Sequence, residues 1–298
     1  MARRQRDVAA DGGSTVVAQV VAQGDRLASR MALVRHKVAV MSGKGGVGKS
    51  SITANLAAVL ASQGYRVGVL DADINGPAIA KMLGVRLQTL SVTHSGIIPA
   101  LGPCSIKVMS MDLLLPGDKA PVVWDAPTQQ SSFVWRGTME AGALREFLSD
   151  TAWGELDFLL VDLPPGTYAF PTLAQLLPDL VGIIVTIPSE VSHLVVKRFI
   201  SLAQELKTPL AGLVENMAGY TCPHCRQVGE LFHAAGDSER MVTEMGIPHL
   251  GSIPFDARLS ASTDWGVPFA LEHGESPAGR ALTCVAAKVE QFVGEARR

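Results

Sequence analysis

Residues 43–50 of the chain read Gly43, Lys44, Gly45, Gly46, Val47, Gly48, Lys49 and Ser50. It matches the phosphate-binding pattern Gly-x-x-x-x-Gly-Lys-Ser/Thr. The apolar run Val38–Met41 precedes it, and apolar residues at helical spacing follow it between Ile52 and Leu60. A strand, a glycine-rich loop and a helix in this order indicate a phosphate-binding loop, or P-loop.

The residue types in this loop predict separate roles. Glycines let the backbone N–H groups turn toward an anion, and the positive end of the following helix points at the same place. We expect Lys49 to reach the β- and γ-phosphates of a nucleotide and the Ser50 hydroxyl to ligate Mg2+. We also expect Ser51, the next residue of the helix, to bind the nucleotide.

A second lysine lies inside the loop. Lys44 follows the first glycine, and we expect its side chain to project away from the phosphates that its own backbone holds. It can serve the nucleotide of a neighbouring subunit, or it can be a solvated loop lysine of the common kind. The residues alone leave both interpretations open.

Composition indicates one enzyme-like domain with a large core. The chain has 298 residues, 47% of them hydrophobic, and a formal net charge of −2, so we expect no nucleic-acid partner. No apolar run approaches the ~20 residues of a membrane span, so we expect no stable membrane insertion.

The N-terminal segment differs from the rest. Residues 1–36 are basic, and we predict a mobile tail with a short helix near Ser14 to Leu33, followed by an ATPase domain over residues 37–298. Asp7 and Asp11 interrupt the apolar core that a signal peptide needs, which favours a cytoplasmic protein.

Continuous apolar runs predict buried parallel strands after the P-loop. They are Val67–Leu70, Phe158–Val161, Val181–Ile187 and Leu210–Val214, with shorter strands at Ile97–Pro99, Ile106–Met109 and Val122–Asp125. Helices, among them one over Gln129–Leu148, alternate with these strands. We therefore predict an α/β fold, a doubly wound and mostly parallel sheet with helices on both faces and ligands at the carboxyl ends of the strands.

Three aspartates follow such strands. Asp162 is placed to hold Mg2+ through water, and Asp71 and Asp73 to polarise the attacking water or to sense the γ-phosphate. An aspartate that caps the next helix is the alternative for each of them.

We expect the base to be adenine. A guanine site would want an Asn-Lys-x-Asp element after a late strand, and the sequence contains none. Asn216 follows the strand Leu210–Val214, and its amide could both donate to and accept from adenine. A turn-forming asparagine is the alternative.

A Cys-Pro-His-Cys stretch lies just beyond, with Cys222 and Cys225 at its ends, in a loop predicted over residues 220–227. It can hold a soft metal or an iron-sulfur cluster, although such sites usually take four ligands. It can also be a redox pair, a structural zinc site completed by His224 or His233, or two inert thiols.

A two-fold dimer removes the shortage of ligands. An isologous interface brings the same patch of both subunits together, so two such pairs would form a four-thiolate site on the axis. The same assembly would bring each Lys44 toward the partner's nucleotide. Cys104 and Cys284 are isolated, and we interpret them as small apolar residues.

From about Lys37 to Val293 the chain resembles the Mrp-type (ApbC/Nbp-like) iron-sulfur cluster carrier ATPases of the MinD-like group with a deviant Walker A motif. The stretches that carry the resemblance are Ser42–Ser50, Leu70–Ile74 with Gly76 and Pro77, Trp135–Gly137, Asp162–Thr167, Val214–Met217, the pair Cys222 and Cys225, and Gly251–Pro254. The P-loop alone indicates only the wider group, and the cysteine pair after Glu-Asn-Met narrows it to this family.

The resemblance implies a homodimer that binds ATP and Mg2+, holds a labile 4Fe–4S cluster between its subunits and delivers it to apoproteins. It also places Pro254 at the nucleotide. The family usually has Gly-Asp where this chain has Tyr168 and Ala169, so we expect slow ATP hydrolysis.

Two functions of other kinds compete with this reading. A MinD- or ParA-like spatial organiser would use the apolar stripe from Ala281 to Val293 as a membrane helix, but packing against the sheet is the commoner fate of such a stripe. A reductase resembling the nitrogenase iron protein would take its cysteines from two separate segments.

Overall fold

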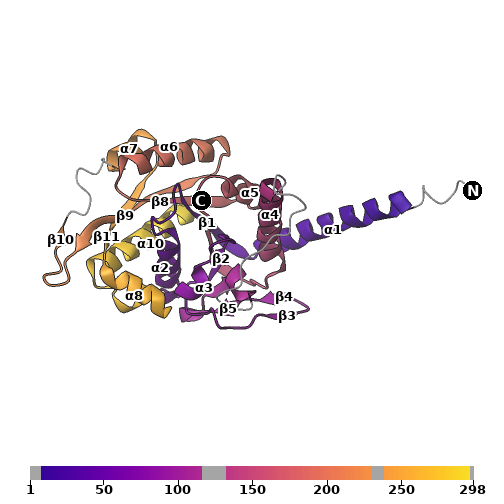
Figure 1. Cartoon of the computed structure of the whole chain (residues 1–298), viewed down its shortest axis with the longest axis horizontal. Coiled ribbons are helices and arrows are strands. Elements are labelled where there is room, and N and C mark those ends of the chain that lie inside the picture. Colours follow the sequence, from indigo (N-terminus) through magenta and orange to yellow (C-terminus); the bar gives the residue numbers. More distant parts are fainter. Residues whose placement is uncertain (1–7, 116–131, 230–237, 296–298) are drawn as a thin grey trace, which may run out of the picture.

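The computed structural model describes residues 8–115, 132–229 and 238–295. Their centre is a nine-stranded sheet in the order β10-β9-β8-β1-β7-β2-β6-β5, with β11 also paired to β9 (Figure 1). Its strands are β1 (Val34–Ser42), β2 (Val67–Asp71), β5 (Ala100–Leu101), β6 (Lys107–Met109), β7 (Leu156–Asp162), β8 (Leu180–Thr186), β9 (Leu210–Thr221), β10 (Val228–Gly229) and β11 (His249–Phe255). A separate hairpin joins β3 (Ser91–Thr93) and β4 (Gly96–Ile98).

The sheet is parallel except at its two ends, where β5 and β10 pair antiparallel. Strand β1 lies in the middle between β7 and β8, and the neighbours of these strands are parallel too. The central strands are buried almost throughout because helices cover both faces, which explains their uninterrupted apolar sequences. The predicted doubly wound, mostly parallel fold is confirmed.

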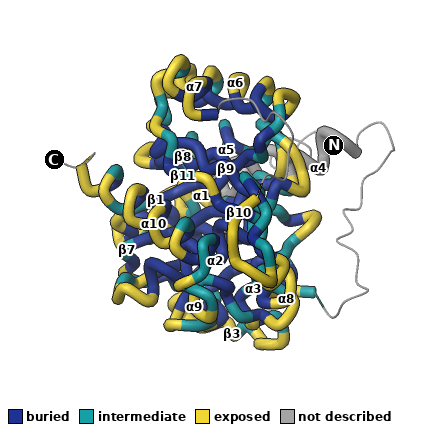
Figure 2. The backbone as a smooth tube through the Cα atoms, turned by 90° about the vertical axis from the view of Figure 1, so that its left-hand side faces the viewer, coloured by how far each residue is buried: buried dark blue, intermediate teal, exposed yellow. Residues whose placement is uncertain are grey.

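Helices form a layer on each side of the sheet. Helices α2 (Lys49–Ser62), α3 (Ile79–Met82), α9 (Phe269–Glu272) and α10 (Pro277–Glu295) share one hydrophobic core with the sheet. Helices α1 (Val8–Met31), α4 (Ser132–Asp150), α5 (Ala169–Leu176), α6 (Glu190–Glu205) and α7 (Ser238–Glu244) bury side chains in the other. Helix α8 (Ala257–Trp265) and short 3₁₀ helices at Pro103–Ser105 and Met111–Leu113 complete the described elements. In Figure 2 the buried backbone lies in the interior, and the exposed backbone lies mostly at the periphery.

The N-terminal region differs from the prediction. Helix α1 begins at Val8 rather than near Ser14, and it projects beyond the body of the protein in Figure 1. Its last turns are part of that body, because Leu27 and Met31 are buried in the same core as α4. The domain boundary predicted between residues 36 and 37 falls inside strand β1, which begins at Val34.

Other predicted elements need smaller changes. Strand β9 continues to Thr221, well past the predicted end at Val214, because its outer part pairs with β10 and β11. The strand predicted at Val122–Asp125 lies outside the described residues. No helix in the described ranges is both long and apolar enough to cross a membrane.

Helix α10 buries the apolar stripe that a membrane-bound organiser would expose. Leu282, Val285 and Val289 are buried in the core shared with α2 and the sheet. The polar residues of the helix, such as Lys288, face outward. The prediction that this stripe packs against its own sheet is therefore confirmed.

Removing part of this stripe should destabilise the whole domain. Leu282 has an exposed fraction of 0%, so Leu282→Ala should lower the free energy of unfolding by about 2–5 kcal/mol, the cost of a cavity in a packed core. Urea denaturation followed by circular dichroism measures it. The control Leu87→Ala, at a side chain that is 98% exposed, should change the free energy by less than about 0.5 kcal/mol. Equal effects of the two substitutions would contradict the packing described.

Candidate functional site

The P-loop connects the end of β1 to the start of α2. Gly46 and Gly48 have φ angles of 78° and 85°, in the left-handed region that favours glycine. Gly48 is also the residue that begins α2, and no side chain caps this helix end. The free N–H groups of the first turn are therefore available to an anion, as the pattern predicted.

Two glycines of the loop lie too close to neighbouring side chains to be replaced by a larger residue. A Cβ atom at Gly43 would lie 2.2 Å from Cγ1 of Val195 on α6, and one at Gly48 would lie 2.3 Å from Nδ2 of Asn216. Both distances are far shorter than any real carbon contact. The glycines are needed for the packing of the loop as well as for its backbone angles.

Lys49, Ser50 and Asp162 meet at the base of the loop. Nζ of Lys49 lies 2.8 Å from Oδ2 of Asp162, with exposed fractions of 6% and 1% for the two side chains. The Ser50 hydroxyl donates to the same oxygen at 2.6 Å, and the Thr53 hydroxyl donates to Oδ1 at 2.7 Å. A cation, a hydroxyl and a carboxylate are thus held at one point, the set that a magnesium-nucleotide site requires.

The cavity over the loop fits a phosphate group. It has a volume of about 210 Å³, and its walls include the loop backbone, Lys49, Ser50, Ser51, Asp73 and Pro165. Ser51 is buried, and its hydroxyl has no hydrogen-bond partner among the described residues. A buried hydroxyl without a partner is costly, so an oxygen of a bound phosphate would complete it.

Asp71 and Asp73 occupy different positions. Oδ2 of Asp71 accepts from the N–H groups of Ala78 and Ile79 at 2.9 and 3.1 Å, so this fully buried carboxylate holds the start of α3. Burial, and then the neighbouring Asp162, raise the pKa of Asp71 to about 7. Asp73 lines the cavity, and burial raises its pKa as well. The geometry of Asp71 is that of the helix-capping alternative, and Asp73 faces the phosphate position.

Asn216 makes a contact that the sequence did not predict. Its Nδ2 donates to the carbonyl oxygen of Val47 at 2.8 Å, and the side chain is buried. The amide group therefore supports the P-loop from behind. Because an amide nitrogen carries two hydrogens, this bond leaves the predicted contact with adenine a prediction. Pro254 is buried near the end of β11, the strand beside β9, and it is not among the residues that line the phosphate cavity.

Lys44 lies at the rim of this cavity and is exposed to solvent. The Ser42 hydroxyl donates to its backbone carbonyl at 3.0 Å, which orients this peptide. This position fits both interpretations of Lys44, contact with a neighbouring subunit and a solvated lysine.

The two cysteines lie in the turn between β9 and β10, a hairpin that projects from the left of the sheet in Figure 1. Both thiols are free, and Cys225 is exposed. Hydrogen bonds from the backbone N–H groups of Cys225 and His224 lower the pKa of Cys222, which favours the thiolate that binds metals. The cysteines thus lie in a turn, whereas Tyr220 and Thr221, which the predicted loop included, belong to β9.

Among the described residues, no three His, Cys, Asp or Glu side chains converge as metal ligands. His224 therefore does not complete a site with the two cysteines in one chain. His233, the other histidine considered, lies outside the described ranges. Within them the pair has two ligands only.

Sequence reasoning missed a buried polar network beside Asn216. The Ser238 hydroxyl donates to Oε1 of Glu215 and lies 2.9 Å from Nε2 of His193, and Ser252 donates to Oε2 of Glu215 at 3.1 Å. This network fixes the start of α7, the helix that follows the cysteine hairpin in the chain. The Glu-Asn-Met stretch gave the only signal, because a glutamate inside an apolar strand needs partners.

The sheet, the P-loop and the buried Asp162 define a P-loop nucleotide-binding protein of the MinD and ParA fold. The cell-division ATPase MinD of Pyrococcus furiosus superposes with a TM-score of 0.60 over 86% of this chain and 99% of its own, at 20% identity. A ParA-family ATPase of Chlorobium tepidum gives a TM-score of 0.52 at 17% identity. These likenesses establish the fold.

Closer relatives narrow the class. The family model of NUBPL iron-transfer P-loop NTPases (ParA) matches residues 33–133 and 127–290. An "iron-sulfur cluster carrier protein" of Saccharolobus solfataricus is 43% identical over 92% of this chain and 90% of the relative, and one of Methanocaldococcus jannaschii is 46% identical over 85% and 84%.

A solved nucleotide-binding protein of Archaeoglobus fulgidus, in complex with ADP and with cobalt found in it, gives a TM-score of 0.69. It is 37% identical over 82% of this chain and 91% of its own. The chain belongs to the iron-transfer P-loop NTPases, the family of the iron-sulfur cluster carriers.

The buried ion pair predicts two effects of Lys49→Ala. The variant should lose measurable MgATP binding in calorimetry, because the ammonium group that neutralises the phosphates is gone. Its free energy of unfolding should also fall, by about 3 kcal/mol, since Asp162 would remain buried without its cation.

Circular dichroism of Lys49→Ala checks that the variant is folded at the temperature of the titration. Lys197→Ala, at an exposed lysine on α6, is the matched control and should change neither quantity. An unchanged MgATP affinity in folded Lys49→Ala would refute the assignment of the P-loop.

Proposed function

We propose that this chain binds MgATP at its P-loop and carries a 4Fe–4S cluster that two subunits share through Cys222 and Cys225, for delivery to apoproteins. The observation that carries the proposal is the position of the two thiols. They lie three residues apart at the tip of one hairpin, with Cys222 half-buried and Cys225 exposed, and no further ligand joins them in the described part of the chain.

The number of ligands argues for a second subunit. A four-iron cluster takes four thiolates, and one chain offers two that are close together. A two-fold axis through the hairpin tip supplies the other two, because an isologous interface repeats the same patch. The cluster is the cargo of this protein, so thiolates at an exposed tip suit both loading and release.

Residues already in contact would hold the nucleotide. The backbone N–H groups of the P-loop and Lys49 would bind the phosphates, and the oxygens of Ser50 and Asp162 would hold Mg2+. Mg2+ neutralises charge that develops on the phosphates. Lys49 must leave Asp162 to reach them, so nucleotide binding exchanges one partner of this ammonium group for another.

We propose that hydrolysis by this site is slow. Tyr168 and Ala169 occupy the start of α5, beside the strand end that carries Asp162, and neither can supply a carboxylate. Asp73 is the acidic residue that lines the phosphate cavity. Phosphoryl transfer relies on charge and positioning, so the missing group should reduce the rate rather than prevent binding.

The proposal gives Lys44 a role across the dimer. Lys44→Ala should retain MgATP affinity, because the loop backbone and Lys49 hold the phosphates, but it should lose most ATP turnover. Nucleotide-dependent dimerisation in sedimentation velocity should weaken with it. The control is Lys207→Ala, remote from the P-loop in sequence and fold. Unchanged turnover and unchanged dimerisation would make Lys44 a solvated lysine.

The shared site makes cluster binding and dimerisation linked equilibria. Cys222→Ala and Cys225→Ala should each abolish the reconstituted cluster while leaving MgATP affinity unchanged, and loading the cluster should tighten the wild-type dimer. Anaerobic reconstitution followed by iron and sulfide assays and by sedimentation measures these effects.

Cys104→Ala and Cys284→Ala are the controls for the cluster experiment, because both thiols are free and exposed but isolated. They should keep the full cluster content. A wild-type monomer that holds its cluster, or a colourless protein that takes up zinc in place of iron and sulfide, would refute the shared iron-sulfur site.

A further inference from the structure

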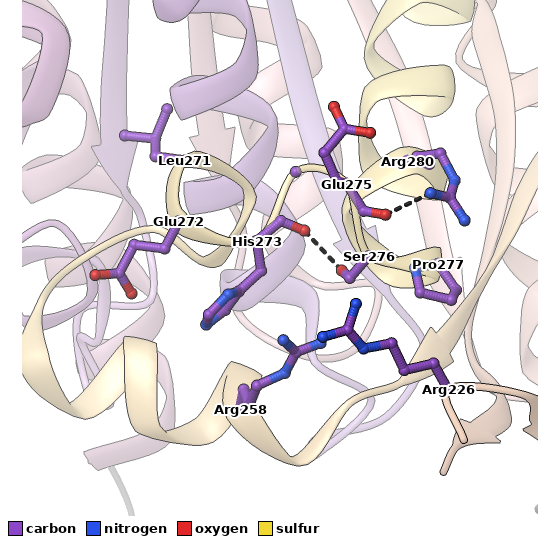
Figure 3. A pocket seen from close by; sticks show the side chains of 10 residues that line it. Arg226, Arg258, Leu271, Glu272, His273, Glu275, Ser276, Pro277 and Arg280 are labelled. Carbon is purple, nitrogen blue, oxygen red and sulfur yellow. Dashed lines mark hydrogen bonds between the residues drawn. The ribbon is translucent and has the colours of Figure 1, made fainter. Parts of the chain in front are cut away.

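A second and larger cavity lies at the foot of the cysteine hairpin. Its volume is about 600 Å³, within the range of small-molecule sites. Its walls come from the hairpin, from the first turn of α8 and from the segment that joins α9 to α10 (Figure 3). Nothing in the nucleotide or cluster sites described above uses it.

Basic side chains dominate this cavity. Arg226, Arg258 and Arg280 line it, together with His273. In Figure 3 the guanidinium groups of Arg226 and Arg258 lie beside each other, although they come from segments about 30 residues apart in the chain. An anion bound between them could accept hydrogen bonds from both guanidinium groups.

The two acidic residues of the wall do not neutralise this pair. In Figure 3 the carboxylates of Glu272 and Glu275 point away from the two neighbouring guanidinium groups. Glu275 contributes its backbone carbonyl instead, which accepts from Arg280. Asp256 neutralises Arg258. Arg226 and Arg280 have no carboxylate partner among the described residues, so these two guanidinium groups supply the unpaired positive charge of the cavity.

Arg258 is already fixed in place. Its Nε and Nη2 donate to the two oxygens of Asp256 at 2.9 and 2.6 Å, and its guanidinium carbon lies 5.8 Å from the centre of the Phe269 ring. Two of its three nitrogens are engaged, and Nη1 has no acceptor among the described residues. This nitrogen is a preorganised donor for an anion.

Arg226 carries a backbone cost. Its φ angle is 60°, in the left-handed region that a long side chain rarely adopts, and its guanidinium group has no ion-pair partner in the described ranges. Its N–H donates to the carbonyl oxygen of Cys222 at 2.8 Å, so it belongs to the turn that presents the thiols. Whatever holds this guanidinium group also holds that turn.

We propose that this cavity binds a small anion with at least two carboxylate or phosphate groups, and that the anion restrains the cysteine hairpin through Arg226. The restraint of the hairpin rests on the proposed carrier function, because it acts on cluster release. Binding of the anion is independent of that function. An anion in contact with Arg226 and Arg258 holds the turn of Cys222 and Cys225 against α8 and slows loss of the cluster.

Equilibrium dialysis tests the binding. Labelled tricarballylate, a tricarboxylate, and labelled pyrophosphate are dialysed separately at low ionic strength against full-length protein without cluster whose P-loop is saturated with MgADP. We expect one of these anions, or both, to bind once per chain, and the comparison identifies the preferred group. Absence of saturable binding of both anions to the wild type would refute the proposal.

Variants locate the site. Arg226→Asn removes the guanidinium group but keeps a residue that tolerates a positive φ angle, and it should weaken binding at least tenfold. Arg198→Asn, at an exposed arginine on α6, is the control and should leave binding unchanged. Equal affinities of the three proteins would overturn the assignment. A second result would also overturn the assignment. If Arg226→Asn lost MgATP affinity and the MgADP-filled wild type bound neither anion, the cavity would belong to the nucleotide site.

Cluster release tests the restraint. The anion that binds should slow removal of the reconstituted cluster by an iron chelator at least threefold in the wild type and in Arg198→Asn, but not in Arg226→Asn. An equal rate with and without the anion in the wild type would refute the restraint and leave the binding site standing. Failure of the wild type to take up a cluster would instead count against the carrier function, and the dialysis result would not depend on it.

Discussion

The hydrogen bond from Nδ2 of Asn216 to the carbonyl oxygen of Val47 joins the nucleotide-binding loop to the strand that precedes the cysteine pair. It ties the P-loop to strand β9, which ends at Thr221, directly before Cys222. A displacement of the P-loop backbone would therefore be passed to the strand that leads to the thiols. Gly48 permits this contact, because any side chain at that position would collide with the Asn216 amide.

The parallel sheet makes the contact possible. Strands β1, β2 and β7 run in the same direction and end at one edge, which holds the P-loop, Asp71 and Asp162. Strand β9 runs parallel to them through β8 and passes this edge at Asn216 before it continues to Thr221. Asp71 and Asp162 are register partners on neighbouring strands. Two carboxylates buried so close together need cations and N–H donors, and Lys49 and the start of α3 provide them. The charges of the phosphate site therefore depend on how the strands that carry Asp71 and Asp162 pair in the sheet.

Local sequence predicted the parts of this arrangement that depend on local chemistry. The glycines and Lys49 identify the P-loop, and the apolar runs identify the central strands, because both signals are contained within a few residues. The exposed turn of the cysteine pair was predicted for the same reason. The partner of Asn216 was not, since its contact with Val47 joins residues that are far apart in the chain. The basic cavity also escaped prediction, because Arg226, Arg258 and Arg280 lie on separate segments that only the fold brings together.

In the proposed function two chains share one cluster through one pair of thiols each. Native mass spectrometry of the anaerobically reconstituted protein, sprayed under non-denaturing conditions, distinguishes this arrangement from a cluster within one chain. A shared cluster gives a species of two chains with one 4Fe–4S cluster, together with cluster-free monomer, and no single chain that carries a cluster. A monomer with a complete cluster, or a dimer with one cluster per chain, would contradict it.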